Sequence, residues 1–438
     1  MSSQPLSDSE RLADTAGMTP PGMDARMPTD GLPLRTGEGS EPVAPGIWLL
    51  HGQGQSFVAE TSVGLVVVDA GPGGNITDDM IASLRRCSDA PVNALCYSHG
   101  HAGYNAGVPQ WLDHARERGD APPRLIAHRN VLRRYGRYRE TRALQQHLNE
   151  MQFRMPPGSF AMQLHDPTEL FDDRLVIGEG ERRIELLWAP SETDCAIALW
   201  HPALKVLYGG PSVIDSVPNV GTPLRTLRDP VRWADTLDAL LALGPERVVR
   251  EFGPTLVGAA VIREVLGLTA RALRWVRAET VRLMNEGLDE REVLSRMHYP
   301  DDLFGQPWMR ATYGDPSFIV RDVYRSENGW WDRNPTSLHP AEPTEVARAL
   351  AAAITDKAAV LCEARRLADG GDIQLALHVI DLLALTAGDA PEQGEARRLK
   401  AKWLRERACE VRTYISKSLY HHGAARLEES YASTARPP

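Results

Sequence analysis

Residues 92–105 read VNALCYSHGHAGYN, a short apolar run followed by two histidines that stand one residue apart. The run is typical of a buried β-strand. On an extended chain, residues i and i+2 face the same way, so His99 and His101 can reach the same metal ion. Gly100 and Gly103 allow the backbone to turn tightly around a bound group. The segment therefore predicts a metal site at the end of a strand.

The composition is that of a globular protein of 438 residues, with 42% hydrophobic and 24% charged residues and a net charge of −9. This length is enough for two or three domains, each with its own core. No cluster of basic residues is interleaved with aromatic residues, so we expect no nucleic acid among the partners. The expected partner of the site is a small-molecule substrate.

The five cysteines are scattered and form no CxxC pair, which favours a reducing cytoplasm over a disulfide scaffold. The N-terminus shows no basic segment followed by an apolar one, as a signal peptide would. No apolar run approaches the ~18 residues that a membrane helix needs. We therefore expect a cytoplasmic protein that does not engage a membrane.

Changes in residue pattern divide the chain into four parts. Residues 1–40 are rich in Pro, Ser, Gly, Asp and Thr and predict a disordered arm. Residues 41–258 alternate short β-rich runs with helical stretches, which predicts a layered α/β domain. Residues 259–415 are helical in pattern and predict an all-α domain, and residues 416–438 read as a polar tail. In the two domains, residues 129–151 read as one helix and residues 343–370 as another helical stretch.

The order of these features resembles the metallo-β-lactamase superfamily, in particular its alkylsulfatase-like branch. In the first half, the segments that carry the resemblance are VVVDAGPG at 66–73, the His99/His101 strand end, SETD at 191–194, PNV at 218–220, RTLRD at 225–229 and GP at 253–254. In the second half they are MNEG at 284–287, YGDP at 313–316, VRDVY at 320–324 and GWWDRNP at 329–335. The tryptophan and Asn-Pro segment is the most specific of these.

The resemblance implies a fold, an activity and an assembly. The fold is an αββα metallo-β-lactamase-like sandwich followed by an all-α dimerisation domain, with metal held at strand ends along one edge. The activity is hydrolysis by a metal-activated water, with sulfate esters as the substrate class of the better-known members. The assembly is a homodimer formed through the helical domain, whose aromatic-rich stretch runs from Trp308 to Trp331.

The metal motif departs from the family's pattern, which is His-x-His-x-Asp-His. His99 and His101 keep its first half, whereas Gly103 and Tyr104 stand where the Asp and the second His are expected. Two other ligand positions are also replaced. Pro211 stands where the family's bridging acid is expected, and Phe252 stands where its last histidine is expected. Most ligands of a second ion are therefore missing.

The ligands that remain predict one divalent metal, held by His99, His101 and Glu192. Two histidines and a carboxylate suit zinc, and they also match the triad that holds iron(II) in oxygenases. Such an ion lowers the pKa of bound water to about 7. Cys195 reads either as a small buried hydrophobe or as a further soft ligand, and Glu251 as a source of another oxygen.

Other residues are predicted to serve the reaction around the metal. Tyr104 is a candidate proton donor in the volume of the missing ion, and Asp69, at a strand end before glycines, is expected to orient the site by hydrogen bonding. The candidate substrate-binding residues are Asn149, Gln152, Asn219 and Arg225, the last for an anionic group of the substrate. In the alternative interpretation, Arg225 and Arg228 do not bind substrate and are surface residues that form ion pairs with acids such as Asp229.

Two further functions stay open at this point. Because half of the metal motif is absent, His99 and His101 could be an inert, hydrogen-bonded pair in a scaffold that binds a small molecule or partner without catalysis. The other alternative is an iron(II)-dependent enzyme that uses the two histidines and Glu192. Metal content separates the scaffold from both metalloenzymes.

Overall fold

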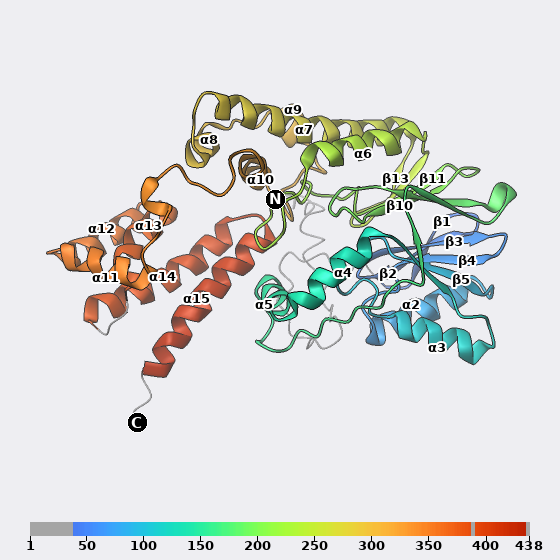
Figure 1. Cartoon of the computed structure of the whole chain (residues 1–438), viewed down its shortest axis with the longest axis horizontal. Coiled ribbons are helices and arrows are strands. Elements are labelled where there is room, and N and C mark those ends of the chain that lie inside the picture. The colour runs from blue at the N-terminus through green and yellow to red at the C-terminus, as the bar shows by residue number, and fades with distance from the viewer. Residues whose placement is uncertain (1–37, 387–389, 435–438) are drawn as a thin grey trace, which may run out of the picture. The chain divides into compact units, whose positions relative to one another are not determined.

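The computed structural model describes residues 38–386 and 390–434, which form two compact units (Figure 1). The first unit contains Met155–Glu327 and the described residues up to Glu150, and the second contains Met151–Arg154 and the described residues from Asn328 on. The disordered arm predicted for residues 1–40 lies outside the described residues, except for its last three.

Two sheets form the centre of the first unit, and their strand orders are those of a layered α/β protein. The seven-stranded sheet has the order β1 (Ser40–Ala44), β2 (Ile47–Gly52), β3 (Gly54–Thr61), β4 (Gly64–Val68), β5 (Val92–Cys96), β6 (Arg124–His128), β7 (Glu169–Phe171). The six-stranded sheet has the order β13 (Leu256–Val257), β12 (Arg247–Arg250), β11 (Val206–Gly210), β10 (Ile197–His201), β9 (Ile184–Trp188), β8 (Arg174–Ile177). The strands from β4 to β7 run parallel to one another.

Alternating side chains place both faces of the first sheet in apolar cores. Phe57 and Val66 face the second sheet, where they share a buried cluster with Leu199. Their sequence neighbours Val58 and Val67 point the other way and join a cluster that contains the helices. Because successive residues of a strand face opposite sides, a strand covered on both faces is apolar throughout.

Helices cover the outer face of each sheet, so the layers are helix, sheet, sheet, helix (Figure 1). On the first sheet these are α2 (Gly74–Cys87), α3 (Val108–Arg118) and α4 (Asn130–Glu140), and on the second they are α6 (Pro230–Ala242) and α7 (Ala259–Asn285). The αββα sandwich implied by the resemblance is confirmed. The helix predicted over residues 129–151 is two helices. The first, α4, ends at Glu140 and is capped by Thr141, whose hydroxyl donates to Arg137 O, and α5 (Arg142–Phe153) follows.

The first unit continues beyond the boundary expected at residue 258. The helices α8 (Glu290–Arg296), α9 (Asp301–Phe304) and α10 (Pro316–Asn328) bury Val293, Leu303 and Ile319 in the same cluster as α7. This shared apolar core explains why the compact unit extends to Glu327.

The second unit is helical and consists mainly of five helices in its described part. These are α11 (Pro343–Ala353), α12 (Lys357–Asp369), α13 (Ile373–Ala384), α14 (Pro391–Glu410) and α15 (Tyr414–Thr434). The helical stretch predicted over residues 343–370 is divided at Asp356, whose side chain caps α12 by accepting from Ala359 N. The polar tail predicted from residue 416 is mostly helix α15, because buried side chains such as Ala424 anchor it. No described helix is both long enough and apolar enough to cross a bilayer.

Candidate metal centre and an adjoining cavity

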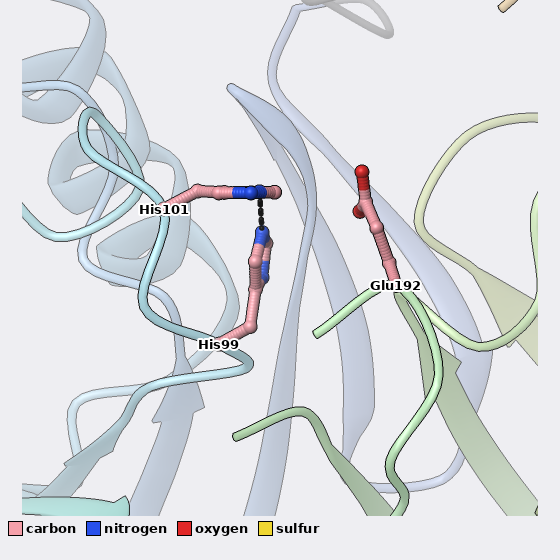
Figure 2. A group of neighbouring side chains, drawn as sticks. All are labelled: His99, His101 and Glu192. Atoms are coloured by element: carbon pink, nitrogen blue, oxygen red, sulfur yellow. Dashed lines mark hydrogen bonds between the residues drawn. The ribbon is translucent and has the colours of Figure 1, made fainter. Parts of the chain in front are cut away.

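The candidate metal centre lies where the central strands end. His99 and His101 follow β5, and Glu192 lies on the loop between β9 and β10. Figure 2 shows the two imidazoles close together on one loop, with the Glu192 side chain on a facing one. One ligand atom from each residue lies within 4.8 Å of the other two, and His99 Nε2 is 2.7 Å from His101 Nδ1. The structure thus brings together the three ligands that the sequence predicts.

Both imidazoles are held in the neutral form, which is the form that binds metal. His99 is fully buried, and burial lowers its pKa to about 3. Burial likewise lowers the pKa of His101 well below its usual value. The Ser98 hydroxyl lies 2.8 Å from His99 Nδ1 and leaves Nε2 directed at His101. His101 Nε2 is buried and has no hydrogen-bond partner among the described residues.

Asp69, which follows β4, fixes the backbone before the histidines. One carboxylate oxygen, Oδ1, accepts from Ser98 N at 2.8 Å and from Asn105 Nδ2 at 3.1 Å. Asn105 in turn accepts from Ala70 N at 3.0 Å. Burial raises the pKa of Asp69 to about 7, against the lowering effect of these hydrogen bonds. Its position agrees with the orienting role predicted from the sequence.

Glu192 is buried in a polar network that keeps it charged. Its Oε1 accepts from Asn219 Nδ2 at 2.7 Å, and it also lies 3.2 Å from Arg228 Nη1 and 3.2 Å from Tyr313 Oη. Burial acts to raise the pKa of Glu192, but the charge of Arg228 is the largest of the opposing effects, and the pKa stays below its usual value. The carboxylate is therefore available as an anionic ligand.

The other side of the centre holds a tyrosine and a carboxylic acid. The Tyr104 hydroxyl donates to Glu251 Oε1, and the Tyr104 ring meets the His99 ring edge-on with centroids 4.4 Å apart. Burial raises the pKa of Glu251 well above its usual value, and Glu251 Oε2 is buried without a partner among the described residues. One of the two Glu251 oxygens that the sequence offered as a further metal ligand is thus engaged by Tyr104.

Gly103 leaves space that another side chain fills. Its φ is +97°, a conformation that side chains other than glycine rarely adopt. A Cβ at this position would lie 2.6 Å from Gln53 Oε1. The place of the expected aspartate is therefore taken by the Gln53 amide.

Of the four predicted substrate-binding residues, Asn219 lies in direct contact with the centre, where its amide holds Glu192. Arg225 donates to Leu224 O at 3.4 Å, and its charge helps to lower the pKa of Glu192. Asn149 donates to Gln145 O within α5. Gln152 belongs to the second compact unit, where it donates to Tyr414 Oη at 2.6 Å. Of these four residues, Asn219 is thus the one that hydrogen-bonds directly to a residue of the His-His-Glu group in the described part of the chain.

Cys195 packs behind the histidine loop and lies outside the His-His-Glu group. Its Sγ accepts from Gly100 N at 3.3 Å and is 3.3 Å from Thr193 Oγ1. The thiol is fully buried, which agrees with the small buried hydrophobe as one of its two interpretations.

A cavity of about 810 Å³ adjoins Glu192 and was missed by the sequence analysis. Its charged lining consists of six arginines and four carboxylates, namely Arg133, Arg134, Arg137, Arg228, Arg232, Arg277, Glu192, Asp194, Asp229 and Glu327. These residues come from segments spread over nearly 200 positions, so no local pattern announces them. The one available signal was Arg228 in the RTLRD segment, which the sequence could not separate from a surface arginine.

Two family models match this chain. Residues 50–250 match the metallo-beta-lactamase superfamily, and residues 289–430 match the alkyl sulfatase dimerisation domain. The chain therefore carries a metallo-beta-lactamase domain followed by an alkyl sulfatase dimerisation domain, as the resemblance predicted.

The chain is homologous to alkylsulfatases. It is 29% identical over 351 residues to a linear primary-alkylsulfatase of Pseudomonas sp. (strain ATCC 19151). The aligned region covers 73% of this chain and 64% of that protein. It is 24% identical over 362 residues to an (R)-specific secondary-alkylsulfatase of Pseudomonas sp., covering 77% of this chain and 54% of that protein. The chain thus spans between about half and two thirds of the length of these relatives.

A solved structure has the same fold. The stereoselective inverting sec-alkylsulfatase Pisa1 from Pseudomonas sp. matches with a TM-score of 0.79 at 19% sequence identity, over 96% of this chain and 69% of that chain. This match supports the αββα sandwich followed by a helical domain.

The residues of the centre fit one divalent ion. Two neutral imidazoles and a charged carboxylate converge, and His101 Nε2 is a buried nitrogen without a partner among the described residues. This set of nitrogen and oxygen donors suits zinc or iron(II). On the opposite side, Tyr104 donates to Glu251 Oε1, and the single carboxyl group of Glu251 offers too few ligands to hold a second ion.

Proposed function

We propose that the protein hydrolyses sulfate esters of small molecules with a single divalent metal held by His99, His101 and Glu192. The observation that carries the proposal is the convergence of these three ligands within 4.8 Å of one another. Homology to alkylsulfatases supports the substrate class. When bound, such an ion would supply a water with a pKa of about 7 and would polarise the ester.

The surrounding residues are assigned supporting roles. Asp69 positions the histidine loop through Ser98 N, and Arg228 keeps Glu192 charged in its buried position. Tyr104, whose ring lies against that of His99, is assigned proton donation to the leaving oxygen. The neutral acid of Glu251, to which Tyr104 is hydrogen-bonded, can then return a proton to Tyr104.

Metal content and sulfate release test this proposal together. Protein produced with zinc, iron and manganese in turn should contain about one equivalent of one metal, measured by mass spectrometry. The loaded protein should release sulfate from decyl sulfate, measured by ion chromatography. Less than about a tenth of an equivalent after every loading would exclude the metal site.

Iron(II) is tested by the same loading series. If iron is the metal retained, anaerobic reconstitution followed by oxygen addition shows whether oxygen is consumed with a sulfate ester. Sulfate release without oxygen uptake supports the hydrolase, and oxygen uptake coupled to substrate loss supports the iron(II) enzyme.

One observation favours a second candidate function, a non-catalytic scaffold. The imidazoles lie within hydrogen-bond distance of each other and Glu192 is paired with Arg228, so the network has partners without an ion. In a scaffold, replacing both histidines by alanine leaves ligand binding intact and no metal is retained. If the wild-type protein retains metal and the double variant does not, the scaffold function is contradicted.

We also propose that the protein is a cytoplasmic homodimer. The match of residues 289–430 to a dimerisation domain supports the dimer, and in that unit the Trp330 side chain is 70% exposed. The described cysteines are all free, which agrees with a reducing compartment. Light scattering at micromolar concentration should give twice the chain mass, and a monomer mass would refute the dimer.

A further inference from the structure

The cavity beside Glu192 has more positive than negative charge. Helix α4 contributes Arg133, Arg134 and Arg137, and Arg232 and Arg277 come from α6 and α7. All of these helices lie in the first compact unit up to Glu327. Six arginines face four carboxylates in the lining, so the cavity attracts anions.

The carboxylates of the lining are already engaged. Asp194 pairs with Arg133, Glu192 with Arg228, and Glu327 with Arg277 at 2.6 Å. The fourth carboxylate, Asp229, caps α6 by accepting from two backbone N–H groups. Arg137 and Arg232 also line the cavity and form no ion pair with a carboxylate of the described residues, and the Arg137 guanidinium lies over the Tyr138 ring, 4.9 Å from its centroid.

Two further arginines present buried donors that lack acceptors. Arg134 Nε and Arg277 Nη1 are buried and have no hydrogen-bond partner among residues 38–386 and 390–434. The Arg134 side chain is 11% exposed. Buried donors of this kind are costly when unpaired, and a ligand oxygen in the cavity would satisfy them.

The cavity is linked to the candidate metal centre at two points. Glu192 belongs to both. The stem of Arg134 lies against Gly100, between the two histidines, because a Cβ there would be 2.8 Å from Arg134 Cδ. A molecule with its ester at the centre would therefore extend its organic group among arginines.

An unbranched alkyl group is a poor match for this lining. It offers no acceptor to the guanidinium groups and would remove water from them without replacement. A carboxylate, sulfate or phosphate group accepts two parallel hydrogen bonds from one guanidinium. The volume of about 810 Å³ is that of a site for a drug-sized molecule.

We propose that the substrate carries a second anionic group on its organic part, and that Arg137 and Arg232 bind it while the ester lies at the Glu192 end of the cavity. The identity of the reacting ester rests on the proposed function, whereas the second anionic group rests on the cavity. The recognised chemistry is that of a carboxylate, sulfate or phosphate at the far end of a short molecule.

The test measures binding without hydrolysis. Alkanesulfonates of four, six and eight carbons are compared with the same chains ending in a carboxylate, by calorimetry on zinc-equilibrated protein. Sulfonates resist hydrolysis, so the result does not depend on catalytic activity. At one chain length or more, the carboxylate-bearing compound should bind about tenfold more tightly than its partner.

Two variants locate the effect. In Arg137→Gln and in Arg232→Gln, the ratio of the two dissociation constants should fall toward one. The matched control is Arg139→Gln, on the same helix α4, since Arg139 pairs with Asp166 and does not line the cavity. Thermal denaturation of each variant verifies that it is folded.

Three results would overturn the proposal. They are equal or tighter binding of the plain alkanesulfonates at every length, no binding of any compound, and a ratio that persists in both variants. If the proposed hydrolysis fails but the carboxylate-dependent ratio is found and collapses in the variants, the anion site stands and only the assigned reaction is refuted.

Discussion

The two sides of the candidate metal centre share one short segment, from His99 to Tyr104, but differ in chemistry. On one side, one ring nitrogen each of His99 and His101 and one carboxylate oxygen of Glu192 lie within 4.8 Å of one another. On the other side, only a few residues along, Tyr104 is hydrogen-bonded to Glu251. The first side offers metal ligands and a charged carboxylate, whereas the second offers a phenol and a carboxylic acid that favours its neutral form.

The difference between the two carboxylates comes from their neighbours. Both are buried, which raises the pKa of a carboxyl group. Arg228 lies 3.2 Å from Glu192, and its positive charge offsets the effect of burial on the pKa of Glu192. Glu251 has no cation within hydrogen-bond distance among the described residues, and the negative charge of Glu192 raises its pKa further. Arg228 is thus the largest of the effects that keep the Glu192 carboxylate charged.

The largest effect is expected from removing the ligand side. In His99→Ala/His101→Ala, the metal content should fall below about a tenth of an equivalent and sulfate release should fall about a thousandfold, because no imidazole remains to hold the ion. Mass spectrometry and ion chromatography measure the two quantities. His298→Ala is the control, since that exposed residue lies outside the group. Retained sulfate release in the double variant would contradict the metal mechanism.

A second variant tests the charge of Glu192. Arg228→Met should lower the free energy of unfolding of the metal-free protein by about 3 kcal/mol, because it leaves a buried carboxylate without its cation. Saturating zinc should restore part of this loss, since the ion takes over the charge. Urea denaturation with and without zinc measures both effects. Arg139→Met, which breaks an exposed pair, should cost less than about 1 kcal/mol. A loss in Arg228→Met as small as in this control would refute the role of the pair.

Asp69 gives a pH dependence of smaller size. Its pKa is about 7 in the folded protein and 3.8 in an unfolded chain, so the folded state holds the proton more tightly. This contribution to stability is complete below about pH 4 and is lost as pH rises toward 7. Between pH 5 and pH 7, metal-free wild-type protein should lose about 2 kcal/mol relative to Asp69→Asn.

The measurement for Asp69 is urea denaturation of both proteins at a series of pH values with a chelator present. Other groups titrate in both proteins, so the difference between the two curves isolates Asp69. Parallel curves across this range would show that its pKa is not raised.

The smallest effect is expected from an attempt to rebuild the second half of the motif. Gly103→Asp/Tyr104→His should leave the metal content at about one equivalent. At φ +97° an aspartate is strained, and its Cβ would lie 2.6 Å from Gln53 Oε1. Metal analysis after zinc loading compares the variant with wild type. A rise to two equivalents would show that the two sides are interchangeable.

Much of the fold could be predicted because it depends on local pattern. The apolar run before His99 is a strand buried on both faces, and the two histidines lie together on the loop that follows it. The sandwich, the helical second half and the candidate ligand Glu192 followed from the family resemblance. Element ends were harder to predict, since single side-chain contacts at Thr141 and Asp356 decide where one helix stops and the next begins.

The partners of the site could not be predicted in the same way. Asn219 and Arg225 were both taken as substrate ligands, yet Asn219 binds Glu192, and the arginine paired with that carboxylate is Arg228. The amide of Gln152 is bound to Tyr414, more than 260 positions away. Neither contact has a signature in the local sequence.

The sequence by itself determined the strand β5 that precedes His99 and His101 and the absence of ligands at Gly103 and Tyr104. Side-chain alternation and residue identity are local properties, and both can be read without coordinates. Only the tertiary structure decided that Arg228 forms an ion pair with Glu192 and that Tyr104 donates a hydrogen bond to Glu251. It also decided that six arginines line a cavity beside the centre. These depend on which distant segments meet, and the packing of the two sheets and their helices sets those meetings.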